Sequence, residues 1–117
     1  MLPASGAMSG EFELSVVMPT YNRKARLLRV LSALGRQTAD TKHFEVVIVD
    51  DGSTDGTSDA VRATSHPFAL RLLQQKNGGP ARARNTGVDA ASGKLILFLD
   101  DDVEPLPELV GEHLSSH

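Results

Sequence analysis

The sequence contains no cysteine and no tryptophan. Without cysteine, the protein has neither a disulfide framework nor a thiolate metal site. The same absence fits a reducing compartment, because disulfides persist mainly in oxidising ones. We therefore expect a cytoplasmic location, with the cytoplasmic face of a membrane as the alternative for a longer natural protein.

Long apolar runs and a large charge excess are also lacking. No run approaches the ~20 apolar residues that a membrane helix needs. The formal net charge is −3, with acidic and basic residues mixed along the chain, and this balance argues against a nucleic-acid partner. Residues 1–12 lack the basic start and apolar run of a secretory signal. We interpret them as a flexible N-terminal tail.

The 117-residue chain does contain a regular alternation of short apolar runs and segments with helical spacing. The apolar runs are residues 14–18, 46–49, 70–73 and 95–99. The second and fourth are apolar on both faces, which is typical of strands that helices cover on both sides. Between the first two runs, Leu27, Leu31 and Leu34 share one helical face, while Arg23 and other arginines supply a solvent-facing side. Further helices are expected from Thr54 to Ser65, from Pro80 to Gly93, and after Pro107.

Strands and helices therefore alternate along the chain. This order predicts the α/β class: a three-layer α/β/α domain over residues 13–117, with a mainly parallel sheet of about four strands. In open parallel sheets, ligands bind beyond the carboxyl ends of the strands. Polar clusters lie at such positions, at residues 19–22, 50–53, 77–80 and 100–102. The sequence thus predicts a binding site along one edge of the sheet.

The aspartate triplet, residues 100–102, follows the last apolar run. In an extended chain Asp100 and Asp102 would point the same way, with Cα atoms roughly 6.6 Å apart, and Asp101 would point away. Two carboxylates at that distance repel unless a cation neutralises them. Magnesium or manganese suits such oxygen ligands. The alternative is a solvated acidic turn.

The other polar clusters allow similar pairs of interpretations. Asp50 and Asp51 can accept hydrogen bonds from a uracil ring or a ribose, or one can cap the helix that follows. We assign Asp55 to that helix start. Tyr21 either stacks on a base or covers the sheet edge.

Residues 77–80 lead into a helix start, where free backbone N–H groups attract anions. Arg82 and Arg84 add positive charge, but residues two apart on a helix face differently, so at most one should reach a ligand. The alternative is a plain glycine turn with solvated arginines.

These segments together resemble family 2 glycosyltransferases of the GT-A fold, in the family's order and spacing. The motifs are SVVMPTYN at 15–22, VDDGSTD at 49–55, NGGPARARN at 77–85 with Gly87, and FLDDD at 98–102. The resemblance covers residues 13–117. It implies transfer of a sugar from a nucleotide-diphosphate donor, often UDP, to a hydroxyl of a saccharide, lipid or protein acceptor, usually with inversion.

The resemblance also implies which residues form the site. Those expected to bind the nucleotide sugar are Pro19, Thr20, Tyr21, Asp50, Asp51, Arg84, Asp100 and Asp101. The D-x-D positions are Asp100 and Asp102, which imply a Mn²⁺ or Mg²⁺ cofactor.

The general base of such enzymes lies well beyond the D-x-D positions, and this chain ends at residue 117. We therefore expect a truncated, weakly active or inactive transferase that keeps donor or metal binding. Exposed sheet edges lead us to expect self-association. The alternatives are a non-catalytic nucleotide-binding module, or a nucleotidyltransferase. The latter usually has a glycine-rich loop after the first strand, and residues 19–22 contain no glycine.

Overall fold

The computed structural model describes residues 12–115. Its sheet has four strands, all parallel, in the order β3-β2-β1-β4. The strands are β1 (Leu14–Thr20), β2 (Phe44–Asp50), β3 (Ala69–Gln74) and β4 (Leu95–Phe98). This confirms the predicted parallel sheet. The predicted tail lies outside the described residues except for Phe12, whose carbonyl accepts a hydrogen bond from the Lys94 N–H at 3.3 Å.

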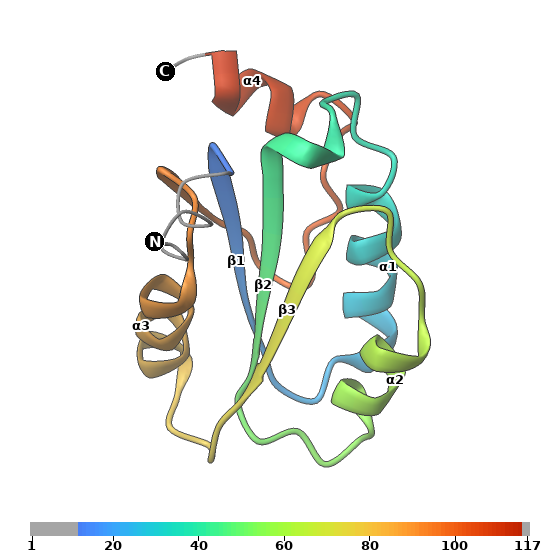
Figure 1. The fold of residues 1–117 in the computed structure, drawn as a ribbon. Helices are drawn as coiled ribbons and strands as arrows, with labels where there is room; N and C mark the ends of the chain where they lie inside the picture. Colours follow the sequence, from blue (N-terminus) through green and yellow to red (C-terminus); the bar gives the residue numbers. More distant parts are fainter. Residues whose placement is uncertain (1–11, 116–117) are drawn as a thin grey trace.

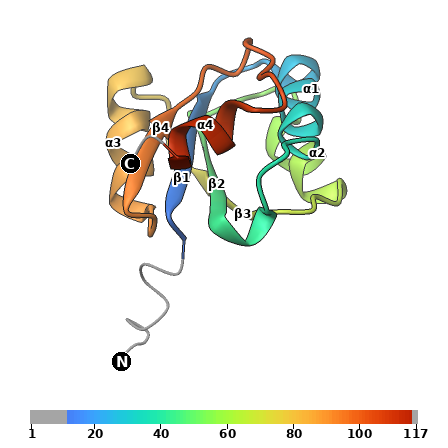
Figure 2. The same cartoon turned by 90° about the horizontal axis from the view of Figure 1, so that it is seen from above.

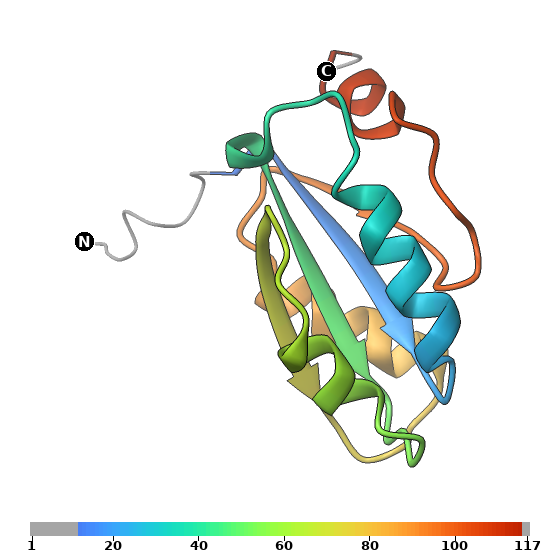
Figure 3. The ribbon, with the colours of Figure 1, turned by 90° about the vertical axis from the view of Figure 1, so that its right-hand side faces the viewer.

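Helices cover both faces of the sheet (Figure 1). They are α1 (Lys24–Leu34), α2 (Thr57–Ala63), α3 (Pro80–Ala90) and α4 (Leu109–Ser115), with a short 3₁₀ turn η1 (Thr41–His43). Viewed from above, α3 lies on one side of the sheet and α1 and α2 lie on the other (Figure 2). Figure 3 shows α1 running along the sheet. The three-layer prediction is therefore confirmed. Within residues 12–115, no helix is long and apolar enough to cross a membrane.

The core lies between the sheet and α1. Every residue of β2 is buried, as its doubly apolar pattern predicts. Leu27, Leu31 and Leu34 form the core face of α1, as their spacing predicts.

The prediction that helices cover the strand on both faces is wrong for β4. Leu95 and Leu97 pack against the core, but Ile96 is 37% and Phe98 48% exposed. The reason is that β4 is an edge strand, and α3 packs over β1 and β2 instead.

Helix α3 packs tightly on the sheet because Gly87 has no side chain. A Cβ at this position would overlap with Val17 Cγ1 and lie 3.3 Å from Val49 Cγ2. Small residues at such positions let a helix approach the strands closely. This contact fixes the start of α3 relative to the carboxyl ends of β1 and β2, where the polar clusters lie.

A buried polar cluster at the amino ends of the strands has no counterpart in the sequence predictions. The Glu45 carboxylate accepts hydrogen bonds from Ser15 Oγ at 2.6 Å, Ser92 N at 2.7 Å and Ser92 Oγ at 2.9 Å. Arg71 Nε lies 3.3 Å from its other oxygen, and Arg71 Nη1 donates to the Ala90 carbonyl at 2.8 Å. Glu45 is 1% exposed. Its buried negative charge is compensated by Arg71 and by the hydrogen bonds from Ser15 and Ser92. The cluster attaches the end of α3 to β1, β2 and β3.

Candidate functional site

An open cleft of about 420 Å³ lies beyond the carboxyl ends of β1, β2 and β4, a volume typical of small-molecule sites. Most of the predicted site residues line it: Pro19, Thr20, Tyr21, Asp51, Arg84, Asp100 and Asp101. The cleft is also lined by Asn77, Gly79 and Pro80, which belong to the predicted polar cluster at 77–80, and by Arg23 and Ala83, which no prediction placed there. Asp50 and Asp102 do not line it.

Asp51 links the cleft to the loop before α3. Its carboxylate accepts hydrogen bonds from Gly78 N at 2.8 Å, Gly79 N at 2.9 Å and Gln75 Nε2 at 2.8 Å. Asn77 Nδ2 lies 3.3 Å away. Burial raises the pKa of Asp51, but the hydrogen bonds outweigh it, and the pKa falls below its ordinary value. Asp51 is therefore an ionised, well-oriented acceptor at the cleft wall.

Asp50 stabilises the loop that leads to the next helix, which was one of the two roles that the sequence allowed for it. Its carboxylate accepts from Ser53 N at 2.9 Å and from Ser58 Oγ at 2.5 Å. The adjacent Gly52 has a φ of +85°, which favours glycine. The predicted nucleotide contact of Asp50 is thus not seen among the cleft residues, because both of its oxygens hold the loop that leads to α2.

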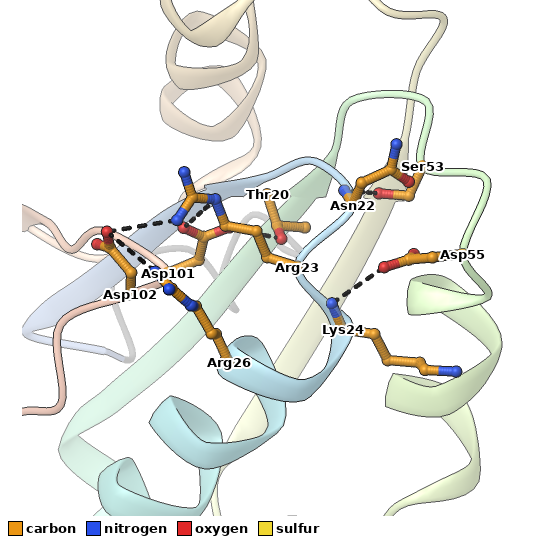
Figure 4. Close-up of polar contacts among 9 residues, drawn as sticks. All are labelled: Thr20, Asn22, Arg23, Lys24, Arg26, Ser53, Asp55, Asp101 and Asp102. Atoms are coloured by element: carbon orange, nitrogen blue, oxygen red, sulfur yellow. Dashed lines mark hydrogen bonds and ion pairs between the residues drawn. The ribbon is translucent and has the colours of Figure 1, made fainter.

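Asp55 holds the first residues of two helices. It accepts from Lys24 N at 3.1 Å, at the start of α1 (Figure 4), and from Thr57 N at 3.1 Å, at the start of α2. The Thr57 hydroxyl also donates to it. The helix-start prediction is confirmed, although α2 begins later than predicted, after Gly56 at a φ of +84°. The hydrogen bond from the Thr57 hydroxyl, together with the backbone hydrogen bonds, lowers the pKa of the exposed Asp55, and slight desolvation opposes the change only in part.

Replacing Asp55 with alanine is expected to lower the free energy of unfolding by about 1 kcal/mol at neutral pH, as for other helix caps. Because the folded-state pKa is below the unfolded one, this contribution is present above about pH 4 and lost as the pH falls through the folded-state value. Urea unfolding at neutral and acidic pH measures the difference from the parent chain. Asp89→Ala, an exposed aspartate of α3, is the control. A difference independent of pH would contradict the assignment.

The loop after β1 is joined to the loop after β2. Asn22, at a φ of +51°, donates its N–H to Ser53 Oγ at 2.8 Å. Its side-chain oxygen accepts from Thr54 N at 2.7 Å. These contacts hold Tyr21 at the cleft, where its side chain is exposed and free to stack on a planar ring.

The aspartate triplet forms a turn, so its predicted extended geometry is wrong. Val103 N donates to the Asp100 carbonyl at 3.3 Å and closes the turn. Asp100 and Asp101 line the cleft, whereas Asp102 lies in a neighbouring hollow with Arg26 and Arg29. An extended chain would have put Asp101 on the other side from Asp100.

Arginines of α1 and the preceding loop neutralise this turn (Figure 4). Arg23 lies 3.7 Å from Asp101 and 3.4 Å from Asp102, and Arg26 lies 3.8 Å from Asp102. Asp101 is buried and accepts from Thr20 Oγ1 at 2.8 Å. Burial raises its pKa, although Thr20 and Arg23 oppose the rise. Arg23 was expected on the solvent side of its helix, and only its closeness to the end of β1 could have indicated a role in the site.

The start of α3 forms the opposite wall of the cleft. Gly79, at a φ of +97°, precedes Pro80 at the first helical position, and both line the cleft. Arg84 lines it too, whereas Arg82 lies against Gly78 and is not among the cleft residues. A helix start with an arginine attracts anions. Of the two arginines only Arg84 lines the cleft, in agreement with the expectation that at most one of them reaches a ligand.

Within residues 12–115, no group of three or more histidine, aspartate or glutamate side chains could hold a metal ion. A cation can also bind to fewer than three such side chains, when other oxygen atoms complete its coordination. Magnesium commonly binds in this way, through one or two carboxylates and the phosphates of a substrate.

Comparison with known proteins decides the family. The sequence profile described as "Glycosyl transferase family 2" matches residues 15–116. The chain belongs to glycosyltransferase family 2. Among curated relatives of this family, a validoxylamine A glucosyltransferase of Streptomyces hygroscopicus subsp. limoneus is 45% identical over 117 residues. The match covers 98% of this chain and 26% of the relative, so the chain spans about a quarter of that protein's length.

Solved structures of the family share the fold. Staphylococcus aureus TarS, residues 1–349, in complex with UDP-GlcNAc superposes with a TM-score of 0.83 at 34% identity, covering 89% of this chain and 30% of that one. The mannosyltransferase PcManGT of Pyrobaculum calidifontis, in complex with GDP-Man and Mn²⁺, superposes with a TM-score of 0.79 at 35% identity, covering 84% and 30%. The α/β sheet described above is therefore that of GT-A glycosyltransferases.

Proposed function

We propose that the cleft binds a nucleotide-diphosphate sugar, most favourably a UDP-sugar, and that the chain is the donor-binding part of a glycosyltransferase. The observation that carries this proposal is that one cleft joins an ionised acceptor, Asp51, an exposed aromatic ring, Tyr21, and the arginine-bearing start of α3. A nucleotide sugar has a part that matches each of these groups. Its base can donate a hydrogen bond to Asp51, the planar base can stack on Tyr21, and its diphosphate suits the arginine-bearing start of α3. The UDP-GlcNAc and GDP-Man complexes of the relatives support this choice.

Each part of the cleft has a proposed task. Pro19, Thr20 and Tyr21 cover the nucleoside, and Asp51 accepts a hydrogen bond from the base. The helix start at Gly79–Pro80 and the guanidinium of Arg84 face the diphosphate, where backbone N–H groups and a fixed positive charge lower the energy of the anion.

A divalent cation fits the turn when the donor supplies further oxygens. We propose that Asp100 and Asp102 would hold it. Asp100 is exposed at the cleft, and Asp102 is held only by partly exposed ion pairs of 3.4 and 3.8 Å, which are typically weak. Asp101, in contrast, is fixed by its buried hydrogen bond to Thr20. When bound, a cation supplies Lewis-acid stabilisation of the charge that develops on the leaving diphosphate.

Transfer to an acceptor hydroxyl with inversion needs a base that takes the hydroxyl proton. Asp51 is poorly suited because its lowered pKa makes it a weak base, and Asp101 is poorly suited because it is buried and accepts a hydrogen bond from Thr20. We therefore propose that the 117 residues bind the donor without efficient transfer, and that the activity belongs to the longer kind of protein that the relatives represent.

Calorimetric titration of the chain with UDP-GlcNAc and GDP-mannose, each with and without Mn²⁺, tests the donor site. We expect Mn²⁺ to strengthen binding. Asp102→Asn should remove at least about tenfold of that metal-dependent gain, since even outer partners of metal ligands contribute 10–100-fold. Asp59→Asn, on the exposed face of α2, is the matched control. Metal-independent binding that Asp102→Asn leaves unchanged would refute the cation assignment, and no binding of either donor would refute the function.

A further inference from the structure

Gln75 directly follows β3 and joins Asp51 to helix α3. Its Nε2 donates to Asp51 Oδ1 at 2.8 Å, and its Oε1 accepts from Thr86 Oγ1, on α3, at 2.6 Å. Its backbone N–H donates to the Asp50 carbonyl at 3.0 Å, which continues the pairing of β3 with β2. Gln75 is half-buried and does not line the cleft, so it acts on the site through Asp51.

The chemistry of its neighbours fixes the orientation of the Gln75 amide. The ionised carboxylate of Asp51 only accepts hydrogen bonds. The amide must therefore turn its NH₂ group to Asp51, which turns its oxygen to Thr86, and the Thr86 hydroxyl must donate to that oxygen. The Arg82 carbonyl, at 3.0 Å, competes for the same proton, but the distance to Gln75 is the shorter one. Thr86 thus holds Gln75, and Gln75 holds Asp51.

The two carboxylate oxygens of Asp51 are not equally occupied. Each can accept about two hydrogen bonds. Oδ1 accepts from Gly78 N and from Gln75 Nε2, both at 2.8 Å. Oδ2 accepts from Gly79 N at 2.9 Å and only weakly from Asn77 Nδ2 at 3.3 Å. Asn77 Nδ2 lies closer to the Asp51 carbonyl, at 3.0 Å, so it keeps a partner when it gives up the longer contact. Oδ2 is therefore the oxygen that can accept a further donor from the cleft.

The bases of nucleotide diphosphates differ in what they present to such an oxygen. Uracil and guanine carry a ring N–H beside a carbonyl on their pairing edge. Cytosine and adenine carry a ring nitrogen without hydrogen at the equivalent position, beside an amino group. The lone pair of that nitrogen is repelled by an anionic oxygen. A site that is built to accept from an N–H rejects a related ligand that lacks it.

We propose that Gln75, held by Thr86, is a positioning residue for base selection: it occupies Oδ1 of Asp51, leaves Oδ2 to the base, and so favours uracil and guanine over cytosine and adenine. This inference rests on the proposed donor-binding function, because it concerns the same site. Without Gln75, Asp51 loses its contact on the side away from the cleft. A less fixed carboxylate can also turn to the amino group of cytosine, so the selection weakens.

The contact with Gln75 also affects the charge of Asp51. Burial raises the pKa of Asp51, and the hydrogen bond from Gln75 is the largest of the contributions that lower it. Gln75→Leu should therefore raise this pKa, because the ionised form loses a donor. Carbon-13 NMR of the carboxyl groups during a pH titration measures the change. Gln74→Leu is the matched control, since the Gln74 side chain accepts from Arg62 instead. An equal pKa in both variants would contradict the orienting contact.

Calorimetric titration with UDP and with CDP, each with Mn²⁺, tests the selection. The two nucleotides share ribose, diphosphate and ring size, so the ratio of their affinities reports the edge of the base. We expect the parent chain to favour UDP at least about tenfold, as for a hydrogen bond to a charged group. Gln75→Leu should lower this ratio about threefold to tenfold, the net contribution of one hydrogen bond. Gln74→Leu should leave the ratio unchanged.

Variants of Thr86 separate positioning from a general effect on folding. Thr86→Val removes the hydroxyl donor and should lower the UDP-to-CDP ratio, whereas Thr86→Ser keeps the donor and should retain it. Circular dichroism verifies that each variant is folded. Equal weakening of UDP and CDP binding in Gln75→Leu, or a parent that binds both equally, would overturn this inference and leave the donor site standing. A parent that binds neither nucleotide would overturn the donor-binding function and the inference with it.

Discussion

Asp51→Ala is expected to abolish nucleotide binding and to lower the free energy of unfolding by about 2–3 kcal/mol. The stability loss arises because the N–H groups of Gly78 and Gly79 lose a charged acceptor, and hydrogen bonds to charged groups typically contribute about 1.5–3 kcal/mol. Binding is lost for two reasons. The base loses its proposed acceptor, and the loop that positions the start of α3 loses its anchor.

Two measurements separate these effects. Urea unfolding gives the stability change, and hydrogen exchange at Gly78 and Gly79 reports the loop. Asp51→Asn, which keeps a side-chain oxygen, should retain more of the stability than alanine does. Asp89→Ala serves as the surface control. If Asp51→Ala binds UDP-GlcNAc as the parent does, and the glycine amides remain protected, then this aspartate has neither role.

Glu45→Ala is expected to lower the free energy of unfolding by about 2–3 kcal/mol, because the buried Ser15 hydroxyl loses its acceptor and an unsatisfied buried donor typically costs about 1–3 kcal/mol. Arg71 would lose its carboxylate, and Ser15 and Ser92 would lose their acceptor. A cavity would also remain where the side chain was. The position nevertheless looks like an ordinary surface glutamate in the sequence.

The matched variant is Glu45→Gln, which keeps the shape and one acceptor oxygen and should lose less stability than alanine. Thermal unfolding ranks the two variants. Because the cluster lies at the amino ends of the strands, any fraction of Glu45→Ala that remains folded should bind nucleotide with the affinity of the parent. Equal stability of parent and alanine variants would show that the cluster is not a stabilising one.

The strands and their order along the chain could be predicted, because each strand is marked by a local run of apolar residues. The run Val46–Val49 is apolar on both faces, and only a strand between two helical layers buries such a run in so few residues. The polar residues after each strand follow from the same logic, since parallel strands end at a common edge. The pattern of the sequence thus predicts Asp51 and Tyr21 at one cleft, and the resemblance to the family adds Arg84; all three line it.

What the sequence could not predict depends on partners distant along the chain. Alternation assumes an extended backbone, and the aspartate triplet instead turns, so Asp102 meets Arg23 and Arg26. Glu45 is buried only because Ser92 and Arg71 reach it from other elements. Pattern alone shows that a residue is polar, and the tertiary contacts decide which charge neutralises it.

The position of β1 in the middle of the sheet has a consequence for synthesis. The ribosome makes β1 before the other three strands of the sheet, yet Leu14 pairs with Phe44 on one side and with Leu95 on the other. Until β4 has been synthesised, one side of β1 therefore has no partner strand. Such late long-range closure is slow and leaves apolar surface uncovered, so a nascent chain of this protein is a natural client for chaperones.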